Sequence, residues 1–268
     1  MKRVSGFAML ACALASLPAW AGDLNSPFQS TVDGITIRNT HLVAGSLASG
    51  KAAVLRGQEP RNQIQQLLDK GVTDVVIFKN ELGTEVRDEI QALRDAKLED
   101  VDHRVHSIPF RWKKLTDADF HESCSQLLEG LTVLRDVLKT PKRRVYFHCT
   151  VGEDRTGLLA GLFRSLNQGW DMTRTFHDEM CENGYEAGNP NKPVGTVVPE
   201  VRRSLTPVFT KMEFLIQKGA LTLDNVDDDS ICDRDPKFDP EWRKEYATAK
   251  FDPKKYRCWH SSQPAAAQ

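Results

Sequence analysis

Apolar and polar positions along the chain divide it into short strand-like runs that alternate with helical patterns. Residues 72–78, 103–109 and 144–147 predict strands, and a weaker alternation at 35–44 predicts an earlier one. Apolar residues at three- and four-residue spacing predict helices at 62–70, 84–96, 116–138, 156–167, 172–183 and 199–217. Strands that alternate with helices predict an α/β fold, with a mainly parallel central sheet flanked by helices on both faces.

The segment 148–157 carries the most specific chemistry, and its sequence is His-Cys-Thr-Val-Gly-Glu-Asp-Arg-Thr-Gly. It joins a predicted strand to a predicted helix and places Cys149 and Arg155 six positions apart, with Gly152 between them. Such a loop directs backbone N–H groups and the positive end of the helix dipole at one point. It binds a phosphate-sized dianion and lowers the pKa of a cysteine beside it. We therefore expect Cys149 to be a thiolate nucleophile.

This pattern, His-Cys-x5-Arg-Thr-Gly between a strand and a helix, resembles the phosphate loop of the protein tyrosine phosphatase superfamily. The likeness is to compact bacterial dual-specificity-like members and extends over roughly residues 55–218. It implies a tyrosine phosphatase-like fold and a cysteine-dependent phosphatase. In the implied reaction Cys149 forms a phosphocysteine that water hydrolyses, and Arg155 binds two phosphate oxygens. No cofactor and no metal ion are needed.

The resemblance also assigns roles around the nucleophile. The substrate-binding residues of the loop are expected to be Thr150, Val151, Gly152, Glu153 and Thr156. Backbone N–H groups hold the phosphate, and the Thr156 hydroxyl is expected to donate to the Cys149 sulfur. The Glu153 side chain is expected to point to solvent.

The leaving oxygen needs a proton donor, and three aspartates are candidates for it. In many relatives an aspartate follows the preceding strand, but Trp112 occupies that position here. Some bacterial relatives and the myotubularins carry an aspartate directly before the arginine, which implies that Asp154 is the general acid. Asp117 and Asp119 are the alternatives, although both also suit the start of the helix at 116–138.

The expected substrate is a small phosphorylated molecule. Arg111, Lys113 and Lys114 lie on a basic turn at the same end of the predicted sheet as the loop, and could bind further phosphates of one ligand. Exported phosphatases with this loop include the tyrosine phosphatase-like phytases, so an inositol polyphosphate such as inositol hexakisphosphate is the preferred substrate. A protein tyrosine or dual-specificity phosphatase is the alternative, and a rhodanese-type sulfurtransferase is a distant one.

The N-terminus predicts export. Lys2 and Arg3 precede an apolar run at 7–17, and Ala19-Trp20-Ala21 matches a cleavage site, so residues 1–21 are expected to be a signal peptide. We expect a phosphatase domain at 22–219, a partly irregular C-terminal extension at 220–268, and a periplasmic or secreted location. Cleavage would lower the 36 basic residues to 34 against 37 acidic ones, which gives no basic excess for nucleic-acid binding. No membrane insertion of the mature chain and no obligate protein partner are expected.

Five cysteines would remain after cleavage: Cys124, Cys149, Cys181, Cys232 and Cys258. An odd number in an exported protein indicates one free thiol, which we expect at Cys149. The other four can pair in three ways, and we favour Cys232–Cys258 because it would fix the C-terminal extension.

Overall fold

The structure, a computed structural model, describes residues 31–32, 35–36, 67–68, 71–80, 84–95, 104–112, 115–140, 143–150, 152–182, 185–186 and 194–258. The expected signal peptide at 1–21 lies outside these ranges. Among the described helices, none is both long enough and apolar enough to cross a bilayer.

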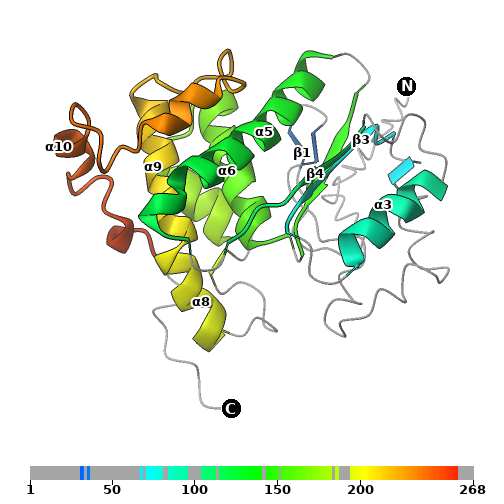
Figure 1. Ribbon diagram of the computed structural model, residues 1–268, viewed down its shortest axis with the longest axis horizontal. Helices are drawn as coiled ribbons and strands as arrows, with labels where there is room; N and C mark the ends of the chain where they lie inside the picture. The colour runs from blue at the N-terminus through cyan, green and yellow to red at the C-terminus, as the bar shows by residue number, and fades with distance from the viewer. Residues whose placement is uncertain are drawn as a thin grey trace, which may run out of the picture.

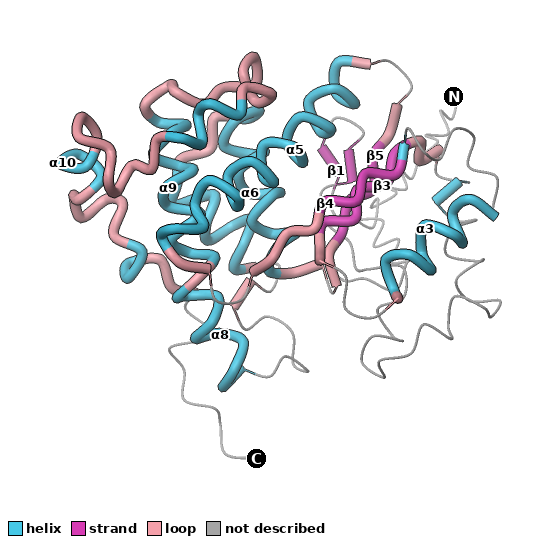
Figure 2. The backbone as a smooth tube through the Cα atoms, viewed as in Figure 1, coloured by secondary structure: helices cyan, strands magenta, loops and turns pink. Residues whose placement is uncertain are grey.

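A twisted central sheet organises the described part of the chain (Figure 2). Its strands are β1 (Thr31–Val32), β2 (Ile35–Thr36), β3 (Asp74–Phe78), β4 (Val105–Ile108) and β5 (Val145–His148). They lie in the order β1-β2-β5-β3-β4. Every neighbouring pair is parallel except β1 with β2, as the sequence predicted for the longer strands.

Helices cover both faces of this sheet (Figure 1). The α-helices are α3 (Glu85–Asp95), α5 (Phe120–Lys139), α6 (Asp154–Gln168), α7 (Met172–Arg174), α8 (Val194–Arg203), α9 (Leu205–Gln217) and α10 (Arg243–Tyr246). Shorter helical segments are η2 (Asp117–Asp119), the π-helix η3 (Thr175–Cys181), η4 (Asp229–Asp233) and η5 (Pro253–Lys255). The α3 helix covers one face, whereas α5 and α6 cover the other, with α9 packed against α6.

The alternation of side chains along β3 explains the two layers. Val75 and Ile77 belong to the cluster that includes residues of α3, while Val76 and Phe78 belong to the larger cluster with α5, α6 and α9. All four are fully buried, because both faces of a parallel sheet must be covered. The predicted fold class is therefore confirmed.

The helix predicted at 199–217 is interrupted. Two helices, α8 and α9, meet at Ser204, whose backbone is at φ −113° and ψ −63°. The physical reason is Pro207, which has no N–H to donate to the carbonyl of Arg203 four residues earlier. The helix predicted at 172–183 is also divided, into α7 and the π-helix η3.

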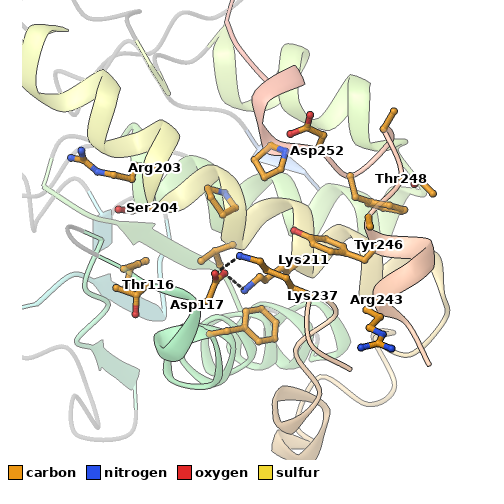
Figure 3. Close-up of a pocket in the computed structure, with 18 residues that line it drawn as sticks. Thr116, Asp117, Arg203, Ser204, Lys211, Lys237, Arg243, Tyr246, Thr248 and Asp252 are labelled. Atoms are coloured by element: carbon orange, nitrogen blue, oxygen red, sulfur yellow. Dashed lines mark hydrogen bonds and ion pairs between the residues drawn. The ribbon is translucent and has the colours of Figure 1, made fainter. Parts of the chain in front are cut away.

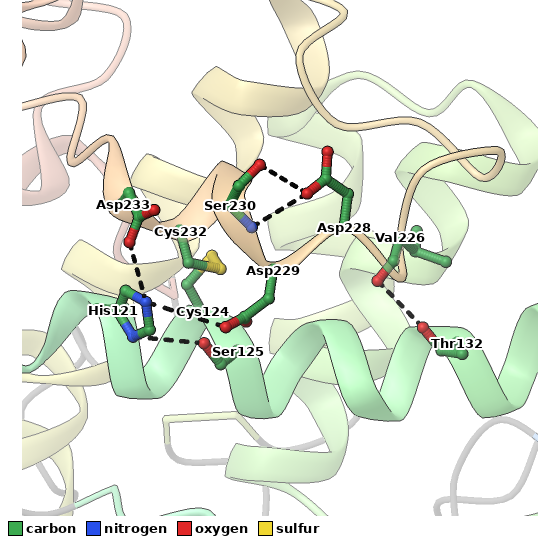
Figure 4. The surroundings of a disulfide bond; sticks show 10 residues. All are labelled: His121, Cys124, Ser125, Thr132, Val226, Asp228, Asp229, Ser230, Cys232 and Asp233. Carbon is green, nitrogen blue, oxygen red and sulfur yellow. Dashed lines mark hydrogen bonds and ion pairs between the residues drawn. A yellow bond between two sulfur atoms is a disulfide. The ribbon is translucent and has the colours of Figure 1, made fainter.

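Two disulfides attach the C-terminal segment, residues 220–258, to helices that precede it in the chain. Neither is the pair that the sequence favoured. Cys124 in α5 is bonded to Cys232 in η4 (Figure 4). Cys181 in η3 is bonded to Cys258. The predicted Cys232–Cys258 pair is thus wrong. It assumed that the segment is fixed to itself, whereas each of its cysteines lies against a helix of the preceding region.

Packing and polar contacts also hold the C-terminal segment on α5 and α9. The ring of Phe214 in α9 contacts the rings of Trp242, Tyr246 and Phe251, with centroid separations of 5.0 to 5.9 Å. On α5, the Thr132 hydroxyl donates to the carbonyl of Val226 at 3.0 Å. The segment therefore extends the apolar core, although its sequence has a weak helical pattern.

A buried polar cluster lies between α6, η3 and α9. Ser165 donates to Glu213 Oε1 at 2.5 Å and its hydroxyl lies 2.8 Å from that of Thr175. Burial raises the pKa of Glu213 to about 7, against a smaller lowering by the hydrogen bond from Ser165. This carboxyl is therefore protonated in the folded protein below about pH 7.

The Glu213 cluster predicts a pH-dependent stability. Because the folded-state pKa lies above the usual 4.5, the contribution of the proton is complete below about pH 4.5 and is lost as the pH rises through about 7. Glu213→Gln should remove this loss and exceed the wild type in unfolding free energy at pH 8, by on the order of 3 kcal/mol. Urea unfolding from pH 5 to pH 8 measures the effect. The exposed control Glu122→Gln should keep the wild-type slope; equal slopes for wild type and Glu213→Gln would contradict the prediction.

The Cys181–Cys258 bond closes a loop with a sequence separation of 77 residues. Cys181→Ala/Cys258→Ala should lower the free energy of unfolding by about 3 kcal/mol, because the unfolded chain regains the entropy of that loop. Urea unfolding with and without reductant provides the test, since reduction should close most of the gap to wild type. A gap that persists under reductant would indicate lost packing instead.

Candidate active site

The loop that follows β5 lies at the carboxyl end of the parallel strands and leads directly into α6. Ile77 of β3 pairs with His148 of β5, so these two neighbouring strands end at the same level. The helix α6 begins at Asp154, two residues earlier than predicted, and the side chain of the preceding Glu153 makes no capping hydrogen bond. The first N–H groups of α6 have no partner from that side chain, and a bound anion can accept from them.

Cys149 is the free thiol of the described chain, as predicted. The other four described cysteines form the two disulfides. Cys149 is only 2% exposed, so its thiol is buried.

Arg155 is in the first turn of α6, and its side chain contacts the loop and the end of β3. Its Nη2 donates to Thr150 Oγ1 at 2.7 Å, and its Nη1 donates to Asn80 Oδ1 at 3.4 Å. The residue is 5% exposed, and both acceptors are neutral. A guanidinium held in this way keeps its positive charge for a ligand with two free oxygens.

His148 supports the loop from the sheet. It is fully buried, and its Nδ1 lies 2.9 Å from the carbonyl oxygen of Cys149, to which it must donate. Its Nε2 lies 3.0 Å from Oε1 of Glu89, a fully buried residue of α3. The hydrogen bond through Nδ1 thus orients the peptide group of Cys149, while Nε2 lies beside the Glu89 carboxylate.

The remaining residues of the loop are Gly152, Glu153 and Thr156, and two of them differ from expectation. Gly152 has φ +71°, a left-handed conformation that favours glycine, and it lets the loop turn between Cys149 and Arg155. Glu153 is fully buried, so the expectation that it points to solvent is wrong. Thr156 Oγ1 is buried, and within the described residues it has no hydrogen-bond partner, so the expected bond to the sulfur is not formed. Val151 lies outside the described residues.

The three aspartates proposed as general acid occupy different environments. Asp154 is 8% exposed at the first position of α6. It lies near the buried phenol of Tyr185, whose pKa is raised well above its usual value by burial and further by the charge of Asp154, against a lowering by the hydrogen bond with Thr206. This carboxyl is part of the same loop as Cys149 and Arg155.

Asp117 and Asp119 are engaged elsewhere. Asp117 accepts from Lys211 at 2.9 Å and from Lys237 (Figure 3). Partial burial raises its pKa, but these hydrogen bonds outweigh that effect and hold the pKa below its usual value. Asp119 accepts from the hydroxyl and the N–H of Thr116, which lower its pKa as well. Both carboxylates are therefore stabilised in the ionised form and have structural partners.

A cavity of about 820 Å³ lies beside Asp117, between the start of α5, the junction of α8 and α9, and the C-terminal segment (Figure 3). None of the described residues of the loop (148–150 and 152–156) lines it. This cavity is therefore distinct from the phosphate loop, although the segment before α5 follows β4, whose carboxyl end lies at the same edge of the sheet.

The basic turn is described only in part. Arg111 is exposed, and Trp112 is partly buried against the core, which explains why a tryptophan occupies this position. Lys113 and Lys114 lie outside the described residues.

Sequence reasoning missed Asn80 and Glu89. Asn80 follows β3 at the same edge of the sheet as the loop, and this position after a predicted strand was an available signal. Glu89 lies within a charged helix among several similar residues, and nothing in the sequence distinguishes it as the buried partner of His148.

Part of this chain is similar to known proteins. Residues 55–171 match the model of the tyrosine phosphatase family. A crystal structure of P. aeruginosa TpbA is 21% identical and covers 64% of this chain and 89% of that chain, with a TM-score of 0.37. A variant of TpbA in complex with pTyr is 19% identical and covers 65% and 95%, with a TM-score of 0.38. No curated protein matches the chain significantly. The similarity of residues 55–171 to the tyrosine phosphatase family, with the free Cys149 inside the matched range, supports a cysteine-dependent phosphatase that resembles the tyrosine phosphatases.

Proposed function

We propose that this chain is an exported phosphomonoester hydrolase that acts through a phosphocysteine at Cys149, with inositol polyphosphates as its preferred substrates. The observation that carries the proposal is the loop at the start of α6, which holds the free thiol of Cys149 and the Arg155 guanidinium with its two neutral hydrogen-bond partners. The family match gives the rhodanese alternative no support.

In the proposed reaction the Cys149 thiolate attacks phosphorus, so that a sulfur–phosphorus bond forms as the ester bond breaks. Asp154 gives its proton to the leaving oxygen. Water then attacks the phosphocysteine, Asp154 takes a proton from that water, and phosphate and thiolate are released. Arg155 and the loop N–H groups stabilise the charge on the phosphate oxygens throughout. No cofactor takes part in these steps.

Export is supported by the N-terminal pattern at 1–21 and by the two disulfides, since disulfides persist in oxidising compartments. The polyphosphate preference is supported by the exposed Arg111, which begins the basic turn after β4. Hydrolysis of phosphotyrosine in proteins is the second candidate, because the matching family is that of the tyrosine phosphatases.

The nucleophile and the substrate are tested together. Wild-type protein should release phosphate from inositol hexakisphosphate faster than from phosphotyrosine peptides, and Cys149→Ser should abolish release from both. The release of inorganic phosphate is measured over time for each protein with each substrate. Activity that survives Cys149→Ser would refute the mechanism, whereas ready release from phosphotyrosine peptides alone would refute the polyphosphate preference.

The general acid is tested by leaving-group dependence. Asp154→Asn should lower kcat by about 100-fold on alkyl phosphates, whose leaving oxygen needs a proton, and far less on p-nitrophenyl phosphate. Asp117→Asn and Asp119→Asn are the comparison variants, and both should respond equally to the two leaving groups. If the selective slowing appears in either of these instead, the acid is that residue.

A further inference from the structure

The guanidinium of Arg155 is held from two separate strand ends. Thr150, which accepts from Nη2 at 2.7 Å, belongs to the phosphate loop itself. Asn80, which accepts from Nη1 at 3.4 Å, lies 75 residues earlier in the chain, just beyond β3. The contact with Asn80 therefore ties the ligand-binding arginine to a different part of the sheet.

Asn80 has a rigid base. Two residues before it, the ring of Phe78 is fully buried and stacks on Phe110 with a centroid separation of 4.6 Å. The pairing of Ile77 with His148 fixes how far β3 extends relative to β5. Because this register is set by burial on both faces, the Asn80 amide cannot shift along the sheet without moving the core.

The neutral amide of Asn80 is a suitable partner for Arg155, because the guanidinium must keep its charge to bind a phosphate dianion. An amide oxygen orients a guanidinium by accepting one hydrogen bond, but it carries no charge. A carboxylate at the same position would form an ion pair with Arg155 and compete with phosphate for the same N–H groups. Burial of Arg155, which is 5% exposed, strengthens that competition because solvent screens it little.

We propose that Asn80 is a positioning residue of the phosphate site, whose amide oxygen fixes the plane of the Arg155 guanidinium without neutralising its charge. This inference rests on the proposed function of the loop. It predicts that a negative charge at residue 80 is more harmful than the loss of the side chain.

The test compares Asn80→Ala with the isosteric Asn80→Asp, using kcat and KM on p-nitrophenyl phosphate from pH 4 to pH 8. Asn80→Ala should lower kcat/KM by about tenfold, as expected for one lost hydrogen bond from a charged donor. Asn80→Asp should lower it by at least about 100-fold at pH 7, and the gap between the two variants should narrow as the pH falls and the new carboxylate is protonated. Asn167→Asp, which adds the same charge about 18 Å along α6 from Arg155, is the matched control and should behave as wild type.

A binding measurement separates this inference from the proposed function. In the Cys149→Ser background, calorimetry with inorganic phosphate should show weaker binding for Asn80→Asp than for Asn80→Ala, and thermal unfolding confirms that both variants fold. Variants that lose activity equally at every pH, or that stay within twofold of wild type, overturn the role of Asn80. If the wild type releases no phosphate, the proposed function fails, while the calorimetric comparison still decides whether Asn80 positions Arg155.

Discussion

The parallel pairing of β5 with β3 is the constraint on which the site depends. Opposite Ile77, His148 ends its strand at a level that brings Thr150 and Asn80 to the same arginine. Side chains of both strands are buried on both faces, so a shift of one residue would turn apolar groups towards the wrong layer. The core of the sheet therefore fixes where the loop after β5 begins.

The C-terminal segment also stabilises the helices on one face of the sheet. Its two cysteines bond to α5 and η3, and its aromatic rings surround Phe214 of α9. Lys237 from the same segment reaches Asp117, just before α5. These contacts make residues 220–258 part of the packing around α5 and α9, rather than an appendage.

Charge is distributed differently at the loop and beside it. Within the loop, the cation of Arg155 faces neutral oxygens and stays available to an anion. Beside it, Asp117 is neutralised by lysines, which lowers its pKa and suits a structural role. Asp117, an alternative to Asp154 as the general acid, is thus bound to two lysines. Spacing alone could not have shown this, because both lysines come from elements far away in the chain.

By itself, the sequence determined the fold class, the order of strands and helices, the nucleophile loop and the free thiol at Cys149. Each of these follows from local information, namely apolar periodicity, a short motif and an odd number of cysteines. Only the tertiary structure decided the disulfide pairing, the burial of Glu153, the break at Ser204, and the contacts of Asn80 and Glu89 with the loop. These features depend on contacts between residues that are far apart in the sequence. A local pattern along the chain does not specify which of those residues come into contact.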